Sequence, residues 1–243
     1  MRTSDPDMES NVTHPRNAAA ERSDFDNLPL SAPLAKPRLR GVLHLTAFPI
    51  SAVLGVILVL LAHGNTGKAA CAIYAVAIAQ LFGVSALYHR GRWGPKTGKM
   101  LQRIDHADIY LAIAGSYTPI GLLLLHGAAS VAVLAVVWGG AFAGIILSIA
   151  WPSAPRIILV PTYVVVGWAA VFVLPEIMHQ GGVAVMVLVV AGGLMYTAGG
   201  IIYALKKPNP APRTFGFHEV FHSCTIAAWI VQYIAISMAA YRF

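Results

Sequence analysis

Two histidines stand four residues apart near the C-terminal end of the sequence. They occur in the segment TFGFHEVFHSCTIAAW, where His218, Glu219 and His222 form the pattern H-E-x-x-H. In a helix, residues four apart are separated by about 40° around the axis and about 6 Å along it, so both imidazoles can reach one metal ion. The same pattern occurs in zinc proteases, where the glutamate is the general base. The segment therefore predicts a metal site, and a protease is one class of protein to weigh.

Two other segments carry polar residues that could complete such a site. Ser85 and His89 have the same spacing in SALYHR, and Asp105 opens the segment RIDHADIYLAIAGSYTP. Together with His218 and His222, His89 would supply three nitrogens and leave the fourth tetrahedral position of Zn²⁺ for water, as in catalytic zinc sites. Asp105 could accept a proton from that water or hold it in place. Ser85 could hydrogen-bond in the surroundings of the metal or to a substrate carbonyl.

Several further polar residues have simpler interpretations. Asp108 fits the N-terminal turns of a helix, where the dipole favours an acid, yet it lies about 60° from Asp105 around the axis and stays open as the partner. His44 and His106 are interpreted as amphipathic anchors near a membrane interface. Three other histidines are expected on outer loops as surface residues, with a second metal site there as the less favoured alternative: His63, His126 and His179.

The composition indicates which kind of protein positions these residues. Of the 243 residues 57% are hydrophobic and only 11% are charged, which is typical of an integral membrane protein. Six of the ten acidic residues lie in the first 26 positions, and the others are Asp105, Asp108, Glu176 and Glu219. Acids within so apolar a region are costly unless they cap a helix or serve a site. The net charge of +7 requires no nucleic-acid partner, because basic loops are a normal feature of membrane proteins.

Seven apolar stretches are long enough to cross a bilayer as helices, for which roughly 20 residues are needed. We place them at about 42–62, 68–89, 106–125, 129–150, 157–175, 183–204 and 217–239. The fifth has prolines at both ends and is the weakest of the set. Gly140 and Gly144 suit a close approach between helices. The expected fold is an all-α membrane protein, a bundle of seven transmembrane helices with short connections.

Basic residues in alternate loops predict the orientation of this bundle. One side of the predicted membrane carries Lys36, Arg38, Arg40, Arg90, Arg92, Lys96, Lys99, Arg103, Arg156, Lys206, Lys207 and Arg213. The other side carries only Lys68 and Arg242. The positive-inside rule then predicts a cytoplasmic N-terminus and an outside C-terminus. His89, Asp105 and the H-E-x-x-H segment would all lie at the cytoplasmic face.

The N-terminal region differs from the rest of the chain. Residues 1–40 are polar, rich in Pro and Ala, and without an apolar run of their own, so we expect a disordered cytoplasmic tail before a transmembrane domain at 41–243. The two cysteines, Cys71 and Cys224, form no CxxC pair and predict neither a disulfide framework nor a cysteine metal site.

The three motifs in this order resemble the bacterial hemolysin III family, a branch of the progestin and adipoQ (adiponectin-receptor-like) superfamily. The resemblance extends over about residues 40 to 240. The S-x-x-x-H pattern of the wider family is matched by Ser85 and His89, its aspartate by Asp105, and its H-x-x-x-H by His218 and His222. Glu219 is not part of that pattern, although it remains a second candidate base. Hormone binding, as in adiponectin-receptor relatives, is not expected here.

The resemblance implies a seven-helix zinc protein with a cytoplasm-facing site, similar also to alkaline ceramidases, which hydrolyse a lipid amide. We therefore expect an intramembrane hydrolase in the bacterial inner membrane, with Zn²⁺ at His89, His218 and His222. Asp105 and Ser85 are the expected catalytic residues. Membrane lipids are the expected substrates or ligands, and a homo-oligomer is left open.

Two other classes of function are weighed against the hydrolase. A pore-forming or hemolytic protein, or a sensor of membrane state with structural zinc, would need no turnover; however, the nearly uncharged spans argue against a wide channel within one chain. An intramembrane metalloprotease usually takes its third ligand from an aspartate of a distant helix, whereas this sequence offers His89. The H-E-x-x-H segment also lies in the last predicted span, so the protease is disfavoured.

Overall fold

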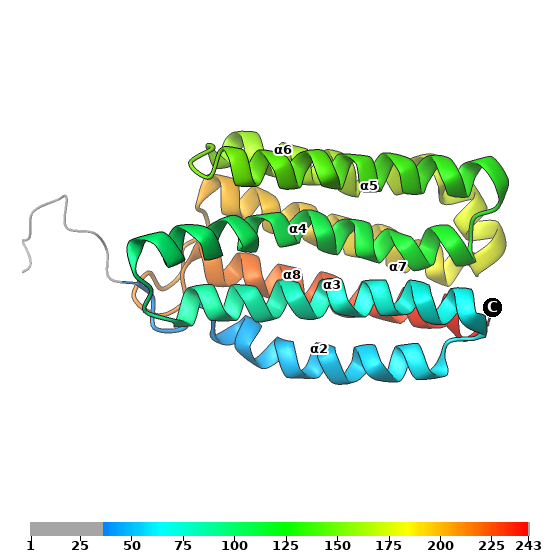
Figure 1. Cartoon of the computed structure of the whole chain (residues 1–243), viewed down its shortest axis with the longest axis horizontal. Helices are drawn as coiled ribbons and strands as arrows, with labels where there is room; N and C mark the ends of the chain where they lie inside the picture. The colour runs from blue at the N-terminus through cyan, green and yellow to red at the C-terminus, as the bar shows by residue number, and fades with distance from the viewer. Residues whose placement is uncertain (1–35, 243) are drawn as a thin grey trace, which may run out of the picture. The chain divides into compact units, whose positions relative to one another are not determined.

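The structure is a computed structural model that describes residues 36–242, and most of the predicted tail lies outside the described residues. Within them the chain is helical, without a β-strand. The elements are α2 (Val42–Leu61), α3 (Gly64–Arg90), α4 (Pro95–Leu123), α5 (Gly127–Ala150), α6 (Arg156–Gly167), the short 3₁₀-helix η1 (Ala169–Val173), α7 (Leu174–Leu205) and α8 (Phe217–Ala240). The long helices run side by side along the long axis of the molecule (Figure 1).

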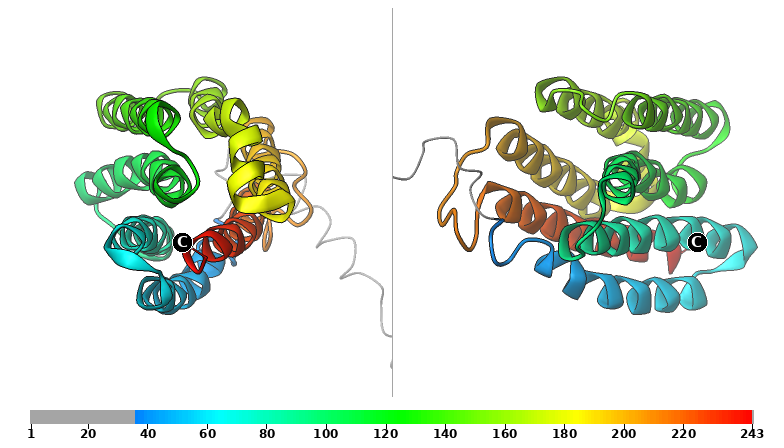
Figure 2. Two further views of the ribbon diagram at one scale, coloured as in Figure 1. Left: turned by 90° about the vertical axis from the view of Figure 1, so that its right-hand side faces the viewer. Right: turned by 60° about the vertical axis from the view of Figure 1, so that its left-hand side comes forward.

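The helices form a closed bundle in which each packs against the next in the sequence. α8 also contacts α2 and α4, so the last helix lies against the first described helix and reaches the middle of the bundle. The end-on view shows the helices following one another around the bundle (Figure 2). Short loops join antiparallel neighbours, as expected for a helix bundle. The C-terminal end of α3 and the N-terminal ends of α2, α4 and α8 therefore meet at one end of the molecule.

Three helices differ from the predicted spans. α7 begins at Leu174 rather than near residue 183, and Gly182, at φ 85° and ψ 168°, interrupts its helical geometry close to the predicted start. α4 begins at Pro95 rather than near residue 106, because Gly94 is extended and the proline occupies the first helical turn, where no hydrogen bond from its nitrogen is needed. α6 ends at Gly167, and η1 replaces the rest of the predicted fifth span before α7 begins at Leu174. The loop between α6 and α7 is thus a tight helical turn within an apolar stretch.

By length and composition, five helical stretches of the described residues could cross a membrane. They are Val42–Leu61, Gly64–Arg90, Gly127–Ala150, Arg156–Leu205 as one continuous stretch of 50 residues, and Phe217–Ala240. α4 is not among them, because residues 95–105 include four charged side chains and the remainder includes His106, Asp108 and several small or polar residues, which lower its hydropathy. Leu60 and Phe172 expose 70% and 85% of their surface, which lipid rather than water would cover.

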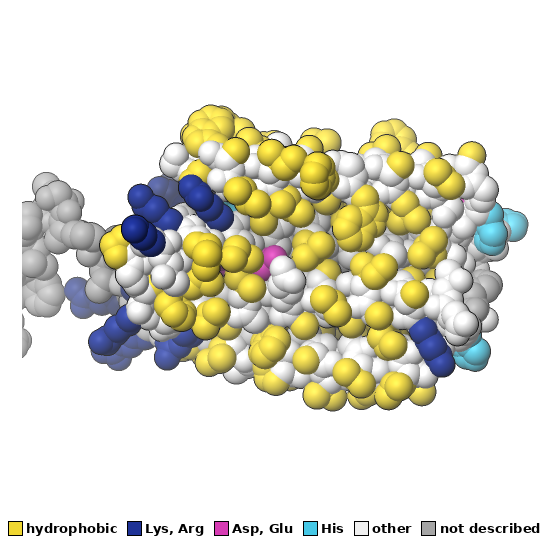
Figure 3. Space-filling view, in the orientation of Figure 1, with side chains coloured by type: hydrophobic (Ala, Val, Ile, Leu, Met, Phe, Trp, Pro, Cys, Tyr) yellow, Lys and Arg dark blue, Asp and Glu magenta, His cyan; other side chains and the backbone are white. Residues whose placement is uncertain are grey.

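The surface agrees with a multi-pass membrane protein. Hydrophobic side chains cover the sides of the bundle, while Lys and Arg gather at one end (Figure 3). This is the charge distribution that the basic loops predict, because those loops lie at the end where α3, α4 and α8 meet. The apolar sides and the basic end together give the molecule the polarity of a membrane-embedded bundle.

Glycines let α5 approach its neighbours closely, as the sequence predicts for Gly140 and Gly144. A Cβ atom at Gly144 would lie 2.1 Å from the ring of Tyr110 on α4, and one at Gly140 would lie 2.9 Å from Val166 on α6. The Tyr110 hydroxyl hydrogen-bonds with Thr162 of α6. These contacts join α4, α5 and α6 on the side of the bundle away from α2.

Residues 36–40, which the sequence assigns to the tail, pack against the segment that precedes α8. The amides of Arg38 and Leu39 donate to the carbonyl oxygens of Arg213 and Thr214, at 3.0 and 3.1 Å. Arg40 forms a buried ion pair with Glu219 of α8. The helical unit therefore begins at Lys36. Hydrogen bonds and an ion pair connect its first residues to the segment before its last helix and to the start of that helix.

Candidate metal centre

Three buried histidines from two helices meet at the basic end of the bundle. His89 lies in the last turn of α3, and His218 and His222 lie in the first two turns of α8. Each offers a ring nitrogen, and these three nitrogens lie within 4.8 Å of one another. The Nε2 atoms of His89 and His218 are 3.1 Å apart. The structure thus brings together the three histidines that the sequence predicts as ligands.

This arrangement fits a tetrahedral metal ion. Zn–N bonds of about 2.0–2.1 Å place two nitrogen ligands of a tetrahedral ion about 3.3 Å apart, close to the 3.1 Å between His89 and His218. The three side chains are 2–8% exposed, and imidazole nitrogens suit zinc and several other transition metals. The donor set could therefore hold an ion with one coordination position left open.

Asp105 and Ser85 lie beside the histidines. The Asp105 Oδ2 atom is 3.7 Å from His89 Nε2, and the Ser85 hydroxyl is close enough to the Asp105 carboxyl to act as its hydrogen-bond donor. Ser85 is one turn before His89 on α3, whereas Asp105 comes from α4. The Ser85 hydroxyl and the Asp105 carboxyl therefore lie together at the edge of the cluster.

Asp108 points elsewhere, although the sequence left it open as the partner. It is 2% exposed, and its Oδ1 accepts a 2.7 Å hydrogen bond from Gln80 of α3. Its other oxygen, Oδ2, has no hydrogen-bond partner within the described residues. The carboxylate beside the histidines is thus Asp105.

Both carboxylate oxygens of Glu219, at the start of α8, have partners, unlike those of a free general base. Its Oε2 accepts the backbone N–H of Gly216 at 2.8 Å, which caps the start of α8. Its Oε1 pairs with Nε of Arg40. Both oxygens face partners that hold the helix start in place, so this arrangement does not favour the second candidate base.

His44 corrects one interpretation made from the sequence. Instead of anchoring the chain at an interface, its ring is 3% exposed and stacks on His222, with centroids 3.7 Å apart and planes at 6°. Neither ring nitrogen has a hydrogen-bond partner within the described residues. His44 lies in the first turn of α2, at the same end of the bundle as the cluster, and comparing helix ends could have identified it.

Of the four remaining histidines within the described residues, three lie on the surface, as the sequence predicts, and His106 does not lie where it predicts. His63, His126 and His179 are exposed, as expected of surface residues. The sequence indicates an anchor at the membrane interface for His106, but its half-buried side chain lines the central cavity described below.

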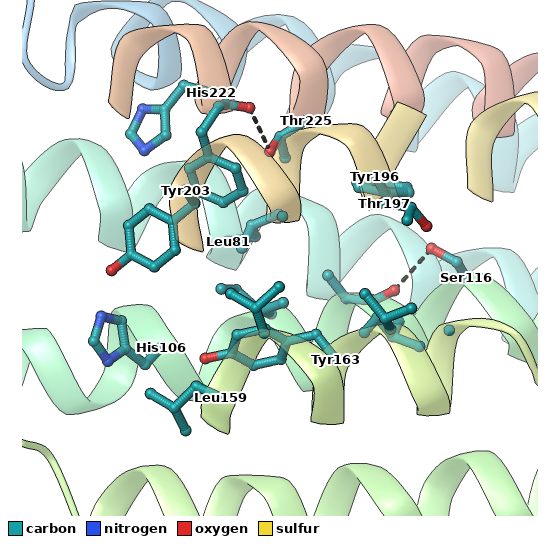
Figure 4. A pocket seen from close by; sticks show the side chains of 18 of the residues that line it. Leu81, His106, Ser116, Leu159, Tyr163, Tyr196, Thr197, Tyr203, His222 and Thr225 are labelled. Carbon is teal, nitrogen blue, oxygen red and sulfur yellow. Dashed lines mark hydrogen bonds between the residues drawn. The ribbon is translucent and has the colours of Figure 1, made fainter. Parts of the chain in front are cut away.

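A largely apolar cavity extends from the histidines into the bundle. This central cavity has an empty volume of about 1220 Å³, including its open side, and residues of α2, α3, α4, α6, α7 and α8 line it. His222, Tyr203 and His106 lie toward one end, and Ser116, Tyr196 and Thr197 toward the other (Figure 4). Asp105, Ser85 and His218 also line it. The cavity therefore joins a largely apolar interior to the histidine cluster at one end.

Comparison with known proteins gives one consistent result. The chain matches the family described as haemolysin-III related over residues 33–233. It is 31% identical to "Hemolysin-3" of Bacillus cereus over 167 residues, which are 65% of this chain and 75% of that protein. It is 32% identical to "Hemolysin-3 homolog" of Bacillus subtilis (strain 168) over 167 residues, 68% of this chain and 74% of that protein.

Proposed function

The chain belongs to the haemolysin-III related family, and from this premise we propose that it is a zinc-dependent hydrolase of lipid amides or esters within the membrane. The observation that carries this proposal is the three-histidine cluster beside a carboxylate at the end of a long apolar cavity. Water, a metal site and an apolar acyl chain would meet at one point there. This combination is the requirement for hydrolysing a bond within a lipid.

The proposal includes a position in the membrane. α4 would cross the bilayer in addition to the five apolar stretches, and Arg156–Leu205 would cross twice, with η1 at the turn, giving seven crossings. The basic end, with the N-terminus, would face the cytoplasm, and the C-terminus would lie outside. A bacterial inner membrane would then supply the lipid directly from the bilayer.

Each residue near the cluster has a distinct role in this mechanism. When bound, zinc would polarise the scissile carbonyl and increase the acidity of a coordinated water. His89, His218 and His222 would hold the ion between α3 and α8. Asp105 accepts the proton of the attacking water and returns one to the leaving amine or alkoxide, so that one water is consumed for each bond broken. Ser85 keeps the Asp105 carboxylate directed at the cluster.

The experiment compares purified variants for metal content and for hydrolysis. Wild type should bind about one zinc per chain and release fatty acid from ceramide or another N-acyl amide, measured by mass spectrometry. His222→Ala should lose both properties, while Asp105→Asn should retain zinc and lose turnover by about 10²-fold or more. His179→Ala is the matched control, because this exposed histidine lies at the opposite end of α7 from the α8 junction. Equal hydrolysis by wild type and His222→Ala would exclude the mechanism.

The name of the Bacillus cereus relative motivates a second candidate, membrane lysis. Liposomes loaded with a dye and containing the purified protein test it directly. Dye release by both wild type and Asp105→Asn would support a pore that needs no turnover. A retained dye load at high protein density would leave the hydrolase as the better candidate.

A further inference from the structure

A buried amide at the inner end of the central cavity has an unmet hydrogen-bonding capacity. The Gln232 side chain on α8 is 9% exposed, and its Oε1 atom has no hydrogen-bond partner within the described residues. Gln232 lines the central cavity and also a second cavity of about 420 Å³. A polar group without a partner at such a depth is costly, and in membrane proteins it marks a site where something binds.

The position of this amide is fixed by the neighbouring helix. A Cβ atom at Gly192 of α7 would lie 2.8 Å from Gln232 Cγ, so the glycine makes the room in which the side chain lies. Gln232 is ten residues after His222 on α8, which places it about 15 Å further along the helix axis. The amide is thus well separated from the metal centre and belongs to a different part of the cavity.

Three of the hydroxyl groups that line the same region already donate elsewhere, and no described donor lies within hydrogen-bond distance of Gln232 Oε1. Ser116 donates to the carbonyl of Ala112 at 2.7 Å, and Tyr117 donates to that of Gly167 at 2.7 Å. Thr197 donates to the carbonyl of Gly193 at 2.8 Å. Each hydroxyl has only one proton to donate, so none of the three provides a donor to Gln232 Oε1. A bound molecule would have to bring that donor itself.

We propose that Gln232 forms a second polar subsite, which accepts a hydrogen bond from a hydroxyl group carried along the chain of the bound lipid. The proposal rests on the proposed function for the presence of a lipid in the cavity, and it specifies the class: hydroxylated acyl chains. An extended chain gains about 1.25 Å per C–C bond of about 1.5 Å, so a separation of about 15 Å corresponds to a hydroxyl about twelve carbons from the carbonyl.

Equilibrium binding to the purified zinc-loaded protein tests the subsite with three radiolabelled probes. These are the ethanolamides of stearic, 12-hydroxystearic and 12-methoxystearic acid. They differ only in the group at carbon 12, and of the three groups only the hydroxyl can donate a hydrogen bond. Wild type should bind the hydroxy compound about 5- to 20-fold more tightly than the other two. Gln232→Met, which keeps the size of the side chain, should bind all three alike. Gln180→Met is the control, since Gln180 lies outside the cavity at the start of α7.

The outcomes separate this proposal from the hydrolase. Three outcomes would overturn the subsite. Wild type could bind all three probes equally, or it could bind the methoxy probe as tightly as the hydroxy probe. The third is that Gln232→Met keeps the full preference for the hydroxy probe. The subsite would also be overturned if none of the three probes bound. If the probes were hydrolysed but bound equally well, the hydrolase would be supported and the subsite rejected. A hydroxyl preference that disappears in Gln232→Met, with no probe hydrolysed, would support the subsite and count against the hydrolase.

Discussion

At the residue scale, two histidines that touch each other have different environments. His222 presents a nitrogen to His89 and His218, whereas His44 lies flat against the His222 ring. Stacking fixes the plane of an imidazole without using its nitrogens. If His222 binds a metal ion, we expect His44 to orient that ligand and not to bind the ion itself.

The replacement of His44 by an aromatic ring tests this difference. His44→Phe should keep the stacked contact and therefore bind metal with the stoichiometry of wild type, whereas His222→Phe should lose about one ion per chain. Metal analysis of the purified variants measures both. If His44→Phe also lost the ion, His44 would be a ligand and the arrangement described above would be wrong.

Glu219 and Arg40 give a second prediction at this scale. Their side chains are 1% and 18% exposed, so Glu219→Ala leaves a largely buried guanidinium unpaired and removes the cap of α8. Losing one partner of such a pair costs about 3 kcal/mol, and Glu219→Gln should cost less because an amide oxygen still accepts from Gly216. Thermal unfolding in detergent should rank the variants accordingly. Equal melting temperatures for all three proteins would contradict a structural role.

The grouping of the three clustered histidines with Asp105 and Ser85 could be predicted from sequence, because helical spacing and the order of helix ends place them at one level. The roles of Glu219 and His44 could not. The partner of Glu219 is Arg40, 179 residues away, and no local pattern links the two. The His44 ring contacts His222 only through the closure of α8 against α2.

At the scale of elements, Gly144 allows α5 to approach α4 closely. A methyl group at Gly144 would meet the Tyr110 ring at 2.1 Å, and a ring cannot bend away as a flexible side chain can. Gly144→Ala should therefore destabilise the protein by about 1–3 kcal/mol, seen as a lower melting temperature.

Gly139 provides the matched control on the same helix. A Cβ atom there meets nothing within 4 Å, so Gly139→Ala should leave stability unchanged or raise it by up to about 1 kcal/mol through helix propensity. If both variants had the same melting temperature, below that of wild type, the loss of stability would come from replacing any glycine of this helix and not from the contact with Tyr110.

The helices themselves were largely predictable, since hydrophobic stretches of about 20 residues set their positions. The differences have local causes. The first turns of α4 are polar and escape a search for apolar runs, although Gly94 and Pro95 mark the helix start. In the fifth span, the switch from α6 to η1 at Trp168 follows from packing: the indole donates to Thr197 of α7 at 2.9 Å, a contact between distant residues.

At the scale of the whole molecule, a bound ion would join α3 to α8 across the bundle. A ligand that binds only the folded state raises stability by mass action, by about 2.7 kcal/mol at a hundredfold excess over its Kd. Removal of metal by EDTA should therefore lower the melting temperature by about 5 °C or more, with recovery on adding zinc. His179→Ala should respond like wild type and His222→Ala should not respond. A melting temperature indifferent to EDTA in every variant would argue against the ion.

The ion pair between Arg40 and Glu219 also has a consequence for biosynthesis. The two residues are 179 positions apart, and at about 5–20 residues per second a ribosome needs about 10–35 s to progress from one to the other. During that time α2 and α3 have left the ribosome while Arg40 lacks its partner and His89 lacks the other two histidines of the cluster. The cluster is consequently completed only when the final helix has been made, so an ion that it holds would be taken up only at the end of translation.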